Sequence, residues 1–370
     1  MHEHPKFQRS LRWVPFQRRS APRGGSLFDA YFHGFAYVCP IAALVKWFPQ
    51  SKGLVSGLAV AGFGFGAFLF SNKHLMVSAE NYIKTHGVSK LFLAHGIVSF
   101  LAIVIGAMLL RNPPTAAAPP SAGPTPAQSD STWQDTLRRP GFYLLWLMFF
   151  SGAMAGLMVI GILKGFAGDQ LLDAARSGGA EWMTDALAEA RASIGDGYNT
   201  WLTKFDTAAG AAERWTFDKG VAAVGWLAIF NAVGRIVWGF VSDRIGRTAT
   251  FIAMFLIQAA MMVVLATLNT ELSLAVGASI IGFNFGGNFA LFPSATADIF
   301  GSKNIGANYG WVFTSYGIAG VVGIAAGNAA KASTGEYRYA FYAAAALCVI
   351  AAGLAVALRV MQKRTQAVAA

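Results

Sequence analysis

Charged residues are scarce in this sequence. They make up 13% of its 370 residues, while hydrophobic residues make up 55%. Ordinary soluble domains carry about 25% charged residues. The apolar residues are also gathered in long stretches without charge. The composition therefore excludes an ordinary soluble domain and predicts a protein that is surrounded by lipid.

Cysteine and the motifs of common catalytic sites are lacking as well. The two cysteines, Cys39 and Cys348, both lie in hydrophobic stretches, and without a Cys/His cluster they indicate neither a disulfide nor a metal site. No nucleophile–base pair stands in a sensible position. The GFGFG string at 62–66 has neither the preceding strand nor the lysine of a phosphate-binding loop. We therefore expect no enzyme, no metal and no cofactor.

Hydrophobic stretches long enough to cross a bilayer are abundant. A membrane-spanning helix needs about 17 to 25 apolar residues, and backbone hydrogen bonds must close internally in lipid, which favours helices. The stretches are 28–47, 53–72, 90–110, 141–163, 220–241, 248–268, 272–296, 308–329 and 338–358. The sequence thus predicts an all-α membrane protein with about nine transmembrane helices.

The net charge of +11 does not indicate nucleic acid, because the basic residues flank the hydrophobic stretches instead of forming one basic face. If the turn at 243–247 lies in the cytoplasm, most of the flanking lysines and arginines fall on the same inner side, as the positive-inside rule requires. Residues 1–27 are the exception. They are basic, fall on the outer side, and lack the apolar centre of a signal peptide.

Two segments of biased composition divide the chain. Residues 112–132 are rich in Pro, Ala and Ser, which predicts an extended, flexible part of a cytoplasmic linker at 112–140. Residues 164–219 are acidic and amphipathic. They are interpreted as an outer insertion, either short helices that cap the outer mouth or a segment that lies passively on the membrane interface.

An arginine inside a hydrophobic stretch carries the most information about function. Arg235 precedes Asp243 by about two helical turns, or about 12 Å of rise. If Asp243 marks the membrane surface, Arg235 lies near the middle of a hydrocarbon core about 30 Å thick. A cation at this depth is costly and normally faces a cavity or a partner. Arg235 is therefore a candidate substrate ligand; the alternative is a structural arginine paired with helix carbonyls.

Several motifs resemble a known family. GFVSDRIGR (239–247) resembles the loop between helices eight and nine of the major facilitator superfamily, although Thr248 departs from the basic residue often found there. FAYVCPIAALVKWFP (35–49), SGLAVAGFGFGA (56–67) and ADIFGSKNIGANYGWVFTSYG (297–317) are similar to the oxalate/formate antiporter family. The resemblance runs from about Tyr31 to the C-terminus, without the insertion.

The resemblance implies the major facilitator fold, with twelve helices in two bundles that work by alternating access. The first hydrophobic stretch aligns with helix four. Residues 28–111 would then hold the remainder of the N-terminal bundle, helices four to six, and 141–370 the C-terminal six-helix bundle. Helices one to three would be missing, and residues 1–27 are interpreted as a non-native tail from a mis-called start or a frameshift. The alternative is an intact, short native protein.

The resemblance also implies substrate ligands. In the oxalate carriers an arginine of helix eight and a lysine of helix eleven hold the two carboxylates of the dianion. Arg235 matches the first position, whereas Tyr316 stands at the second. A dianion would then carry one uncompensated charge into a low dielectric, so a monocarboxylate fits better, with the Tyr316 hydroxyl donating a hydrogen bond. Tyr316 is equally compatible with a packing aromatic.

One hydrophobic stretch contributes two pairs of residues spaced one helical turn apart. Asn284 and Asn288 form one pair, and Phe285 and Phe289 the other. The family resemblance suggests that aromatics of this helix line the substrate cavity, although plain packing is the commoner use of such a pair. Buried amides indicate a cavity or an interhelical hydrogen bond. All four are candidate substrate-binding residues.

A separate role is implied for the charged turn. In the superfamily the corresponding loop latches neighbouring helices in one access state, and the matching positions here are Gly239, Asp243, Arg244, Gly246 and Arg247. The alternative is a charge cluster that only sets topology.

We therefore expect a secondary transporter of small carboxylate anions such as formate, pyruvate or lactate, with oxalate as a further candidate. Exchange is favoured because the clear spans hold no Asp or Glu at mid-depth. The alternatives are a proton-coupled monocarboxylate symporter and a non-functional truncated carrier. The expected partners are a small organic anion and the lipid bilayer, not nucleic acid. The expected form is a monomer that crosses the bacterial inner membrane several times.

Overall fold

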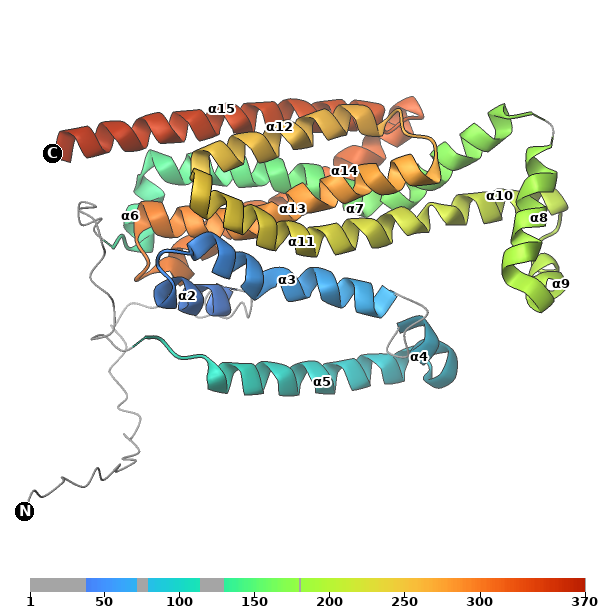
Figure 1. Cartoon of the computed structure of the whole chain (residues 1–370), viewed down its shortest axis with the longest axis horizontal. Helices are drawn as coiled ribbons and strands as arrows, with labels where there is room; N and C mark the ends of the chain where they lie inside the picture. Colours follow the sequence, from blue (N-terminus) through green and yellow to red (C-terminus); the bar gives the residue numbers. More distant parts are fainter. Residues whose placement is uncertain (1–37, 72–78, 114–129, 180, 370) are drawn as a thin grey trace, which may run out of the picture.

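The computed structural model describes residues 38–71, 79–113, 130–179 and 181–369, and all regular elements in these ranges are helices (Figure 1). The first group is α2 (Val38–Trp47), α3 (Lys52–Ser71), α4 (Ala79–His86) and α5 (Val88–Leu109). The long helices that follow are α7 (Pro140–Ser177), α11 (Val221–Ile245), α12 (Arg247–Leu265), α13 (Glu271–Phe300), α14 (Ile305–Thr334) and α15 (Arg338–Ala369). The short α6 (Trp133–Arg138) precedes α7.

The predicted all-α membrane architecture is confirmed. Within the described residues, 7 helices are long and apolar enough to cross a membrane. They correspond to α5, α7, α10 together with α11, and α12 to α15. The expected count of about nine stays a prediction: the apolar helix established in α3 is Lys52–Ala61, which is shorter than a membrane span. Residues 28–37 of the first expected span lie outside the described residues, as do residues 1–27.

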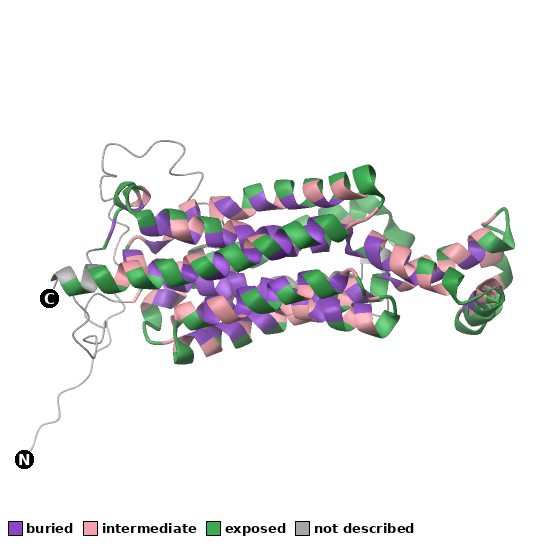
Figure 2. Ribbon diagram, turned by 90° about the horizontal axis from the view of Figure 1, so that it is seen from above, coloured by how far each residue is buried: buried purple, intermediate pink, exposed green. Residues whose placement is uncertain are grey.

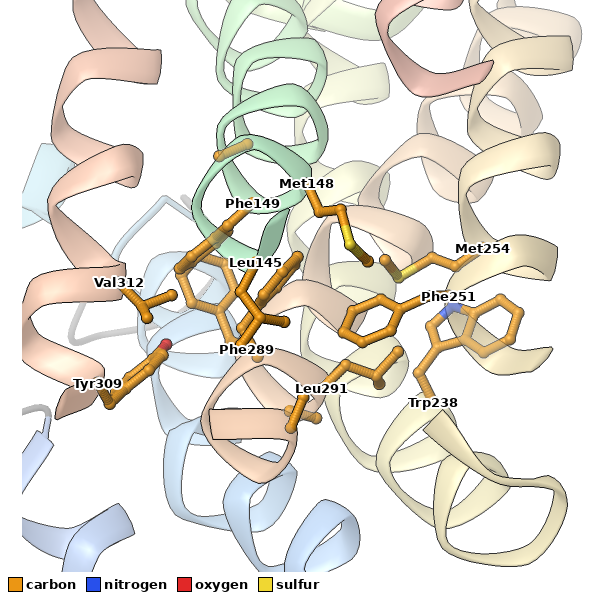
Figure 3. Close-up of a cluster of buried hydrophobic side chains, with 14 of the residues drawn as sticks. Leu145, Met148, Phe149, Trp238, Phe251, Met254, Phe289, Leu291, Tyr309 and Val312 are labelled. Atoms are coloured by element: carbon orange, nitrogen blue, oxygen red, sulfur yellow. The ribbon is translucent and has the colours of Figure 1, made fainter. Parts of the chain in front are cut away.

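The long helices α7 and α11 to α15 form a bundle with an aromatic core. Phe149, Phe251, Phe255 and Phe292 are buried in it, and Phe149 stacks on Phe292 with ring centroids 4.4 Å apart. Buried residues face the inside of the bundle and exposed residues its outside in Figure 2. Figure 3 shows Met148 of α7 pointing toward Met254 of α12 across this core. The outer, apolar surface is what a lipid environment requires.

Glycines bring α11 against two neighbours. A Cβ added to Gly234 of α11 would overlap the carbonyl oxygen of Phe283 in α13, and one added to Gly286 of α13 would overlap the carbonyl oxygen of Asn231. On the other side, a Cβ on Gly57 of α3 would overlap the carbonyl oxygen of Arg235. Small residues permit this backbone contact, which replaces the hydrophobic driving force that helices lack in lipid.

The first group of helices packs unevenly on the bundle. α2 and α3 contribute buried residues such as Ile41, Val45 and Val60 to the main core, whereas α5 contains no buried residue and lies apart from the bundle in Figure 1. The end of α5 is tied to α2, because Trp47 Nε1 donates to the Arg111 carbonyl oxygen at 2.8 Å. Of the expected helices four to six, only the first two therefore contact the C-terminal helices closely.

The end of the predicted flexible linker is fixed. Residues 114–129 lie outside the described residues, but the Ser131 backbone N–H donates to the Phe300 carbonyl oxygen at 2.9 Å. The Asn304 and Asn308 side chains donate to the Ser131 carbonyl oxygen at 3.1 and 3.0 Å. The segment just before α6 is thus bound to the loop between α13 and α14.

The insertion continues the bundle helices beyond its end. α7 runs without a break to Ser177, and α10 (Ala208–Lys219) is followed directly by α11. Figure 1 shows them leading to α8 (Trp182–Ile194), η1 (Gly195–Gly197) and α9 (Tyr198–Leu202) at the end of the molecule opposite to the turn between α11 and α12. It is therefore a helical projection that carries short helices, and whether these cap the outer mouth stays a prediction.

Ion pairs fix the base of this projection. Lys219 pairs with Glu271 at the start of α13 (3.1 Å), and Asp169 of α7 pairs with Lys331 of α14 (2.9 Å). Further out, Arg176 pairs with Glu213 between α7 and α10 (2.5 Å). These pairs attach the projection to the bundle helices, each pair adding modestly because it is exposed.

The glycine contact between α11 and α13 predicts a position-specific effect. Gly234→Ala should lower the thermal stability of the detergent-solubilised protein, by about 1–3 kcal/mol, since the opposing atom is backbone and cannot rotate away. Gly225→Ala on the same helix meets nothing within 4 Å, and alanine there should be neutral or stabilising. Equal melting temperatures for the two variants would contradict the described contact.

Candidate functional site

Arg235 lies at the closest approach of α3 and α11 and is only 4% exposed. Its Nη1 donates to the Val60 carbonyl oxygen of α3 at 2.7 Å, and its Nε donates to Asn231 Oδ1 one turn earlier at 3.2 Å. The guanidinium carbon lies 4.2 Å from the centroid of the Phe289 ring, a cation–π arrangement. The predicted intramembrane cation therefore joins the first group of helices to α11 and α13.

Aromatic rings extend from this arginine. Phe289 meets Tyr316 of α14 edge-on at 5.5 Å and Phe285 at 5.2 Å between centroids. Tyr316 stacks on Phe313 at 5.0 Å and lies 6.2 Å from Phe149 of α7. The structure thus brings four predicted residues together from three helices: Arg235 (α11), Phe285 and Phe289 (α13), and Tyr316 (α14). A guanidinium beside aromatic faces and a tyrosine hydroxyl can receive one small carboxylate.

Asn284 and Asn288 lie on another face of α13. Asn288 Nδ2 donates within the helix to the Phe285 carbonyl oxygen at 3.2 Å. Gly152 of α7 lies against both Asn288 Oδ1 and the ring of Phe255 in α12. Phe285 also faces α7, with its ring against Gly156, whereas Phe289 lies beneath the Arg235 guanidinium. Direct substrate contact by these amides stays a prediction that this placement does not favour.

The charged turn contacts α3 through Asp243. Its Oδ1 accepts from the Gly53 backbone N–H and its Oδ2 from the Leu54 backbone N–H, both at 2.9 Å. These are orphan donors of the first turn of α3, and a carboxylate there also interacts favourably with the helix dipole. The backbone can come this close because Gly239 and Gly53 face each other without side chains.

Lys52 and Asp298, which the sequence pattern did not single out, complete this network. Arg247 pairs with Asp243 at 2.7 Å and, through Nε, with Asp298 of α13 at 2.9 Å. Lys52 of α3 pairs with the other oxygen of Asp298 at 2.7 Å. Asp298 thus bridges two cations from different helices. Its isolated position near the end of a hydrophobic stretch was the one available signal.

The remaining residues of the turn have other positions. Gly246 has φ +88°, where an L side chain is strained, and it joins the end of α11 to the start of α12. Arg244 is exposed, and its guanidinium lies over the ring of Phe240 at 4.1 Å. Gly239, Asp243 and Arg247 therefore contact α3 or its partners, Gly246 shapes the turn, and Arg244 faces outward.

The chain is similar to known membrane transporters over most of its length. Residues 210–369 match the Major Facilitator Superfamily. The chain is 30% identical over 292 residues to an uncharacterized transporter of this type, YhjX of Escherichia coli, covering 78% of this chain and 60% of that protein. It is 28% identical over 326 residues to the oxalate:formate antiporter of Oxalobacter formigenes, covering 87% of this chain and 65% of the antiporter.

A further relative is the apicoplast pyruvate carrier 1 of Toxoplasma gondii, 26% identical over 336 residues, which cover 76% of this chain and 54% of the carrier. This chain therefore spans less than two thirds of the length of each of these relatives. The matched family segment contains Arg235, the charged turn, Phe289 and Tyr316.

The contact between Asp243 and α3 predicts a difference between neighbouring residues. Asp243→Asn keeps the size of the side chain but removes its charge and one acceptor for the two N–H groups, so we expect a loss of about 1–2 kcal/mol in stability. Arg244→Gln, one residue along and exposed, should change stability by less than about 0.5 kcal/mol. Thermal denaturation in detergent compares them; a larger loss for Arg244→Gln would contradict the described network.

Proposed function

We propose that this multi-pass membrane protein, whose residues 210–369 match the Major Facilitator Superfamily, is a secondary transporter of small carboxylate anions that works by alternating access. The observation that carries the proposal is the buried Arg235, held between α3 and the Phe289 ring of α13, which in turn contacts Tyr316 of α14. Two relatives are named for oxalate, formate and pyruvate, which supports carboxylates as the substrate class.

Monocarboxylates are the proposed substrates. Arg235 supplies one positive charge, and the neutral Tyr316 stands at the position where the oxalate/formate resemblance implies a lysine. A single carboxylate matches a single guanidinium through two parallel hydrogen bonds. A dianion would keep one charge uncompensated in a medium of low dielectric. Formate, pyruvate and lactate fit this charge balance; oxalate fits it less well.

Substrate binding is proposed to loosen the contact between α3 and α11. Arg235 Nη1 now donates to the Val60 carbonyl oxygen. A carboxylate that takes both donors of one edge of the guanidinium competes with that carbonyl oxygen for the same hydrogen. The anion therefore replaces a bond between helices with a bond to itself. The anion binds the loosened arrangement more tightly than the closed one, and this difference in affinity shifts the population toward the loosened arrangement.

Within the charged turn, Asp243 and Arg247 are proposed to act as the latch of this closed arrangement. Asp243 caps α3, and Asp298 joins Lys52 to Arg247, so separating α3 from α11 and α13 breaks both sets of contacts together. Exchange is favoured over proton coupling, because proton coupling generally needs an ionisable carboxylate deep in the membrane. Asp298 lies near the end of its helix, and it is paired with Lys52 and Arg247.

Arg235→Gln tests the site. Glutamine retains hydrogen-bonding groups but no charge, and removing one partner of a buried charge pair typically costs about 2–5 kcal/mol. We expect at least about a 30-fold loss of formate or pyruvate counterflow in proteoliposomes, with normal membrane insertion. Arg244→Gln is the matched control on the same helix and should transport normally. Undiminished counterflow by Arg235→Gln would refute the assignment.

Tyr316→Lys tests the charge balance. A second cation beside Arg235 should shift preference toward dicarboxylates such as oxalate, measured as the ratio of oxalate to formate counterflow. Tyr316→Phe removes only the hydroxyl, so it should reduce monocarboxylate transport without improving oxalate. If the ratio is the same in wild type and Tyr316→Lys, Tyr316 does not face the substrate.

A further inference from the structure

Buried amide groups without partners lie inside the C-terminal bundle. Gln258 of α12 is 3% exposed and Asn284 of α13 is 1% exposed, and for each of them neither amide atom has a hydrogen-bond partner among the described residues. Asn288, one turn from Asn284, is 2% exposed, and its Oδ1 also has no hydrogen-bond partner among the described residues. Buried polar atoms of this kind are rare in native proteins, and an unseen water or ion is a usual explanation.

The packing of α12 on α13 brings these amides to one level of the bundle. The two helices are successive and antiparallel, and Gly152 of α7 touches both Asn288 Oδ1 and the Phe255 ring. Met254 of α12 also lies against Gly287 of α13. Asn284 lies one helical turn before Asn288 on α13, and so farther from the loop that joins α11 to α12. Gln258 lies about one helical turn after Met254 and Phe255 on α12, on the face between them. Both amides are therefore displaced in the same direction along the bundle.

The atoms without partners define which guest suits them. They comprise two donor groups, Gln258 Nε2 and Asn284 Nδ2, and three acceptors, Gln258 Oε1, Asn284 Oδ1 and Asn288 Oδ1. A mixed set of donors and acceptors without a charge suits a small neutral molecule that can both donate and accept. Water meets this requirement, and a buried water typically makes about three hydrogen bonds. An anion or a cation would find no opposite charge among these three side chains.

We propose that Gln258, Asn284 and Asn288 form a buried water-binding site that joins α12 to α13. It uses other side chains of α13 than the Arg235 site, because Asn288 lies against Gly152 of α7 and Phe289 lies beneath the Arg235 guanidinium. Water held there satisfies both amides at once and fixes the level of one helix relative to the other. The two amides do not join the helices by themselves, because no direct hydrogen bond links the described Gln258 and Asn284 side chains. The bridging water supplies that link.

The first test is a double-mutant cycle in the full chain. Gln258→Leu and Asn284→Leu should each lower the melting temperature by a few degrees, because each leaves the bridging water and the other amide short of a partner. The double variant should recover most of that loss, since both polar groups are then replaced by apolar ones. If each single change leaves stability unaltered or raises it and the effects add, the amides share no guest.

The second test detects the water itself. X-ray radiolysis of a bound water produces hydroxyl radicals that oxidise a neighbouring buried methionine, and Met262 is one turn from Gln258 on α12. Met262 should be oxidised faster than Met158 of α7, which is equally buried and lies by the glycines of α14. The difference should disappear in the double variant. Equal oxidation of the two methionines in wild type, combined with coupling in the cycle, would mean a direct bond between the amides and would overturn the proposal.

A salt comparison separates water from a cation. The melting temperature of wild type should be the same in sodium and in choline chloride of equal concentration. A sodium-specific increase that is lost in Asn284→Leu would show an ion site in place of the water site, and would also overturn the proposal.

Discussion

Helix α11 is in backbone contact with α3 on one side and with α13 on the other. The position of Arg235 between these helices depends on both contacts. Gly57 of α3 meets the carbonyl oxygen of Arg235, while Gly234 meets the carbonyl oxygen of Phe283 in α13. Larger side chains at these glycines would separate the three helices and move the guanidinium away from both Val60 and Phe289. The substrate-binding proposal therefore relies on residues that cannot themselves contact a substrate.

α3 is held to α11 at two depths by different kinds of chemistry. Near the helix end, Asp243 accepts two backbone N–H groups, and its network includes Lys52, Arg247 and Asp298. Deeper in the bundle, Arg235 donates to a carbonyl oxygen. In the proposed mechanism the substrate anion takes the guanidinium of Arg235 from the Val60 carbonyl oxygen and so weakens the deeper bond. In the outer network, the cations Lys52 and Arg247 are already paired with carboxylates of the protein.

Much of this site could be predicted from the sequence. The apolar stretches predicted the membrane-spanning parts of α7 and α11 to α15, the isolated charge identified Arg235, and the turn at 243–247 identified Asp243. Helical periodicity also separated Asn284 and Asn288 from Phe285 and Phe289, but it could not say which face meets Arg235, since that depends on the neighbours of α13. The pairing of Lys52 with Asp298 joins residues far apart in the chain, so no local pattern reports it. Nor could local composition show that the insertion prolongs α7 and leads from α10 directly into α11, because its polar residues are equally suited to short surface helices.

The unbroken course of α7 has a mechanical consequence. A helix of 38 residues is about 57 Å long, well beyond the roughly 30 Å of a hydrocarbon core, and ion pairs join its outer part to α10 and α14. About 27 Å of this rod therefore extends beyond the hydrocarbon core. A small tilt of the C-terminal helices becomes a displacement of several ångströms at α8 and α9. The projection would thus make the internal state of the protein visible from the aqueous side.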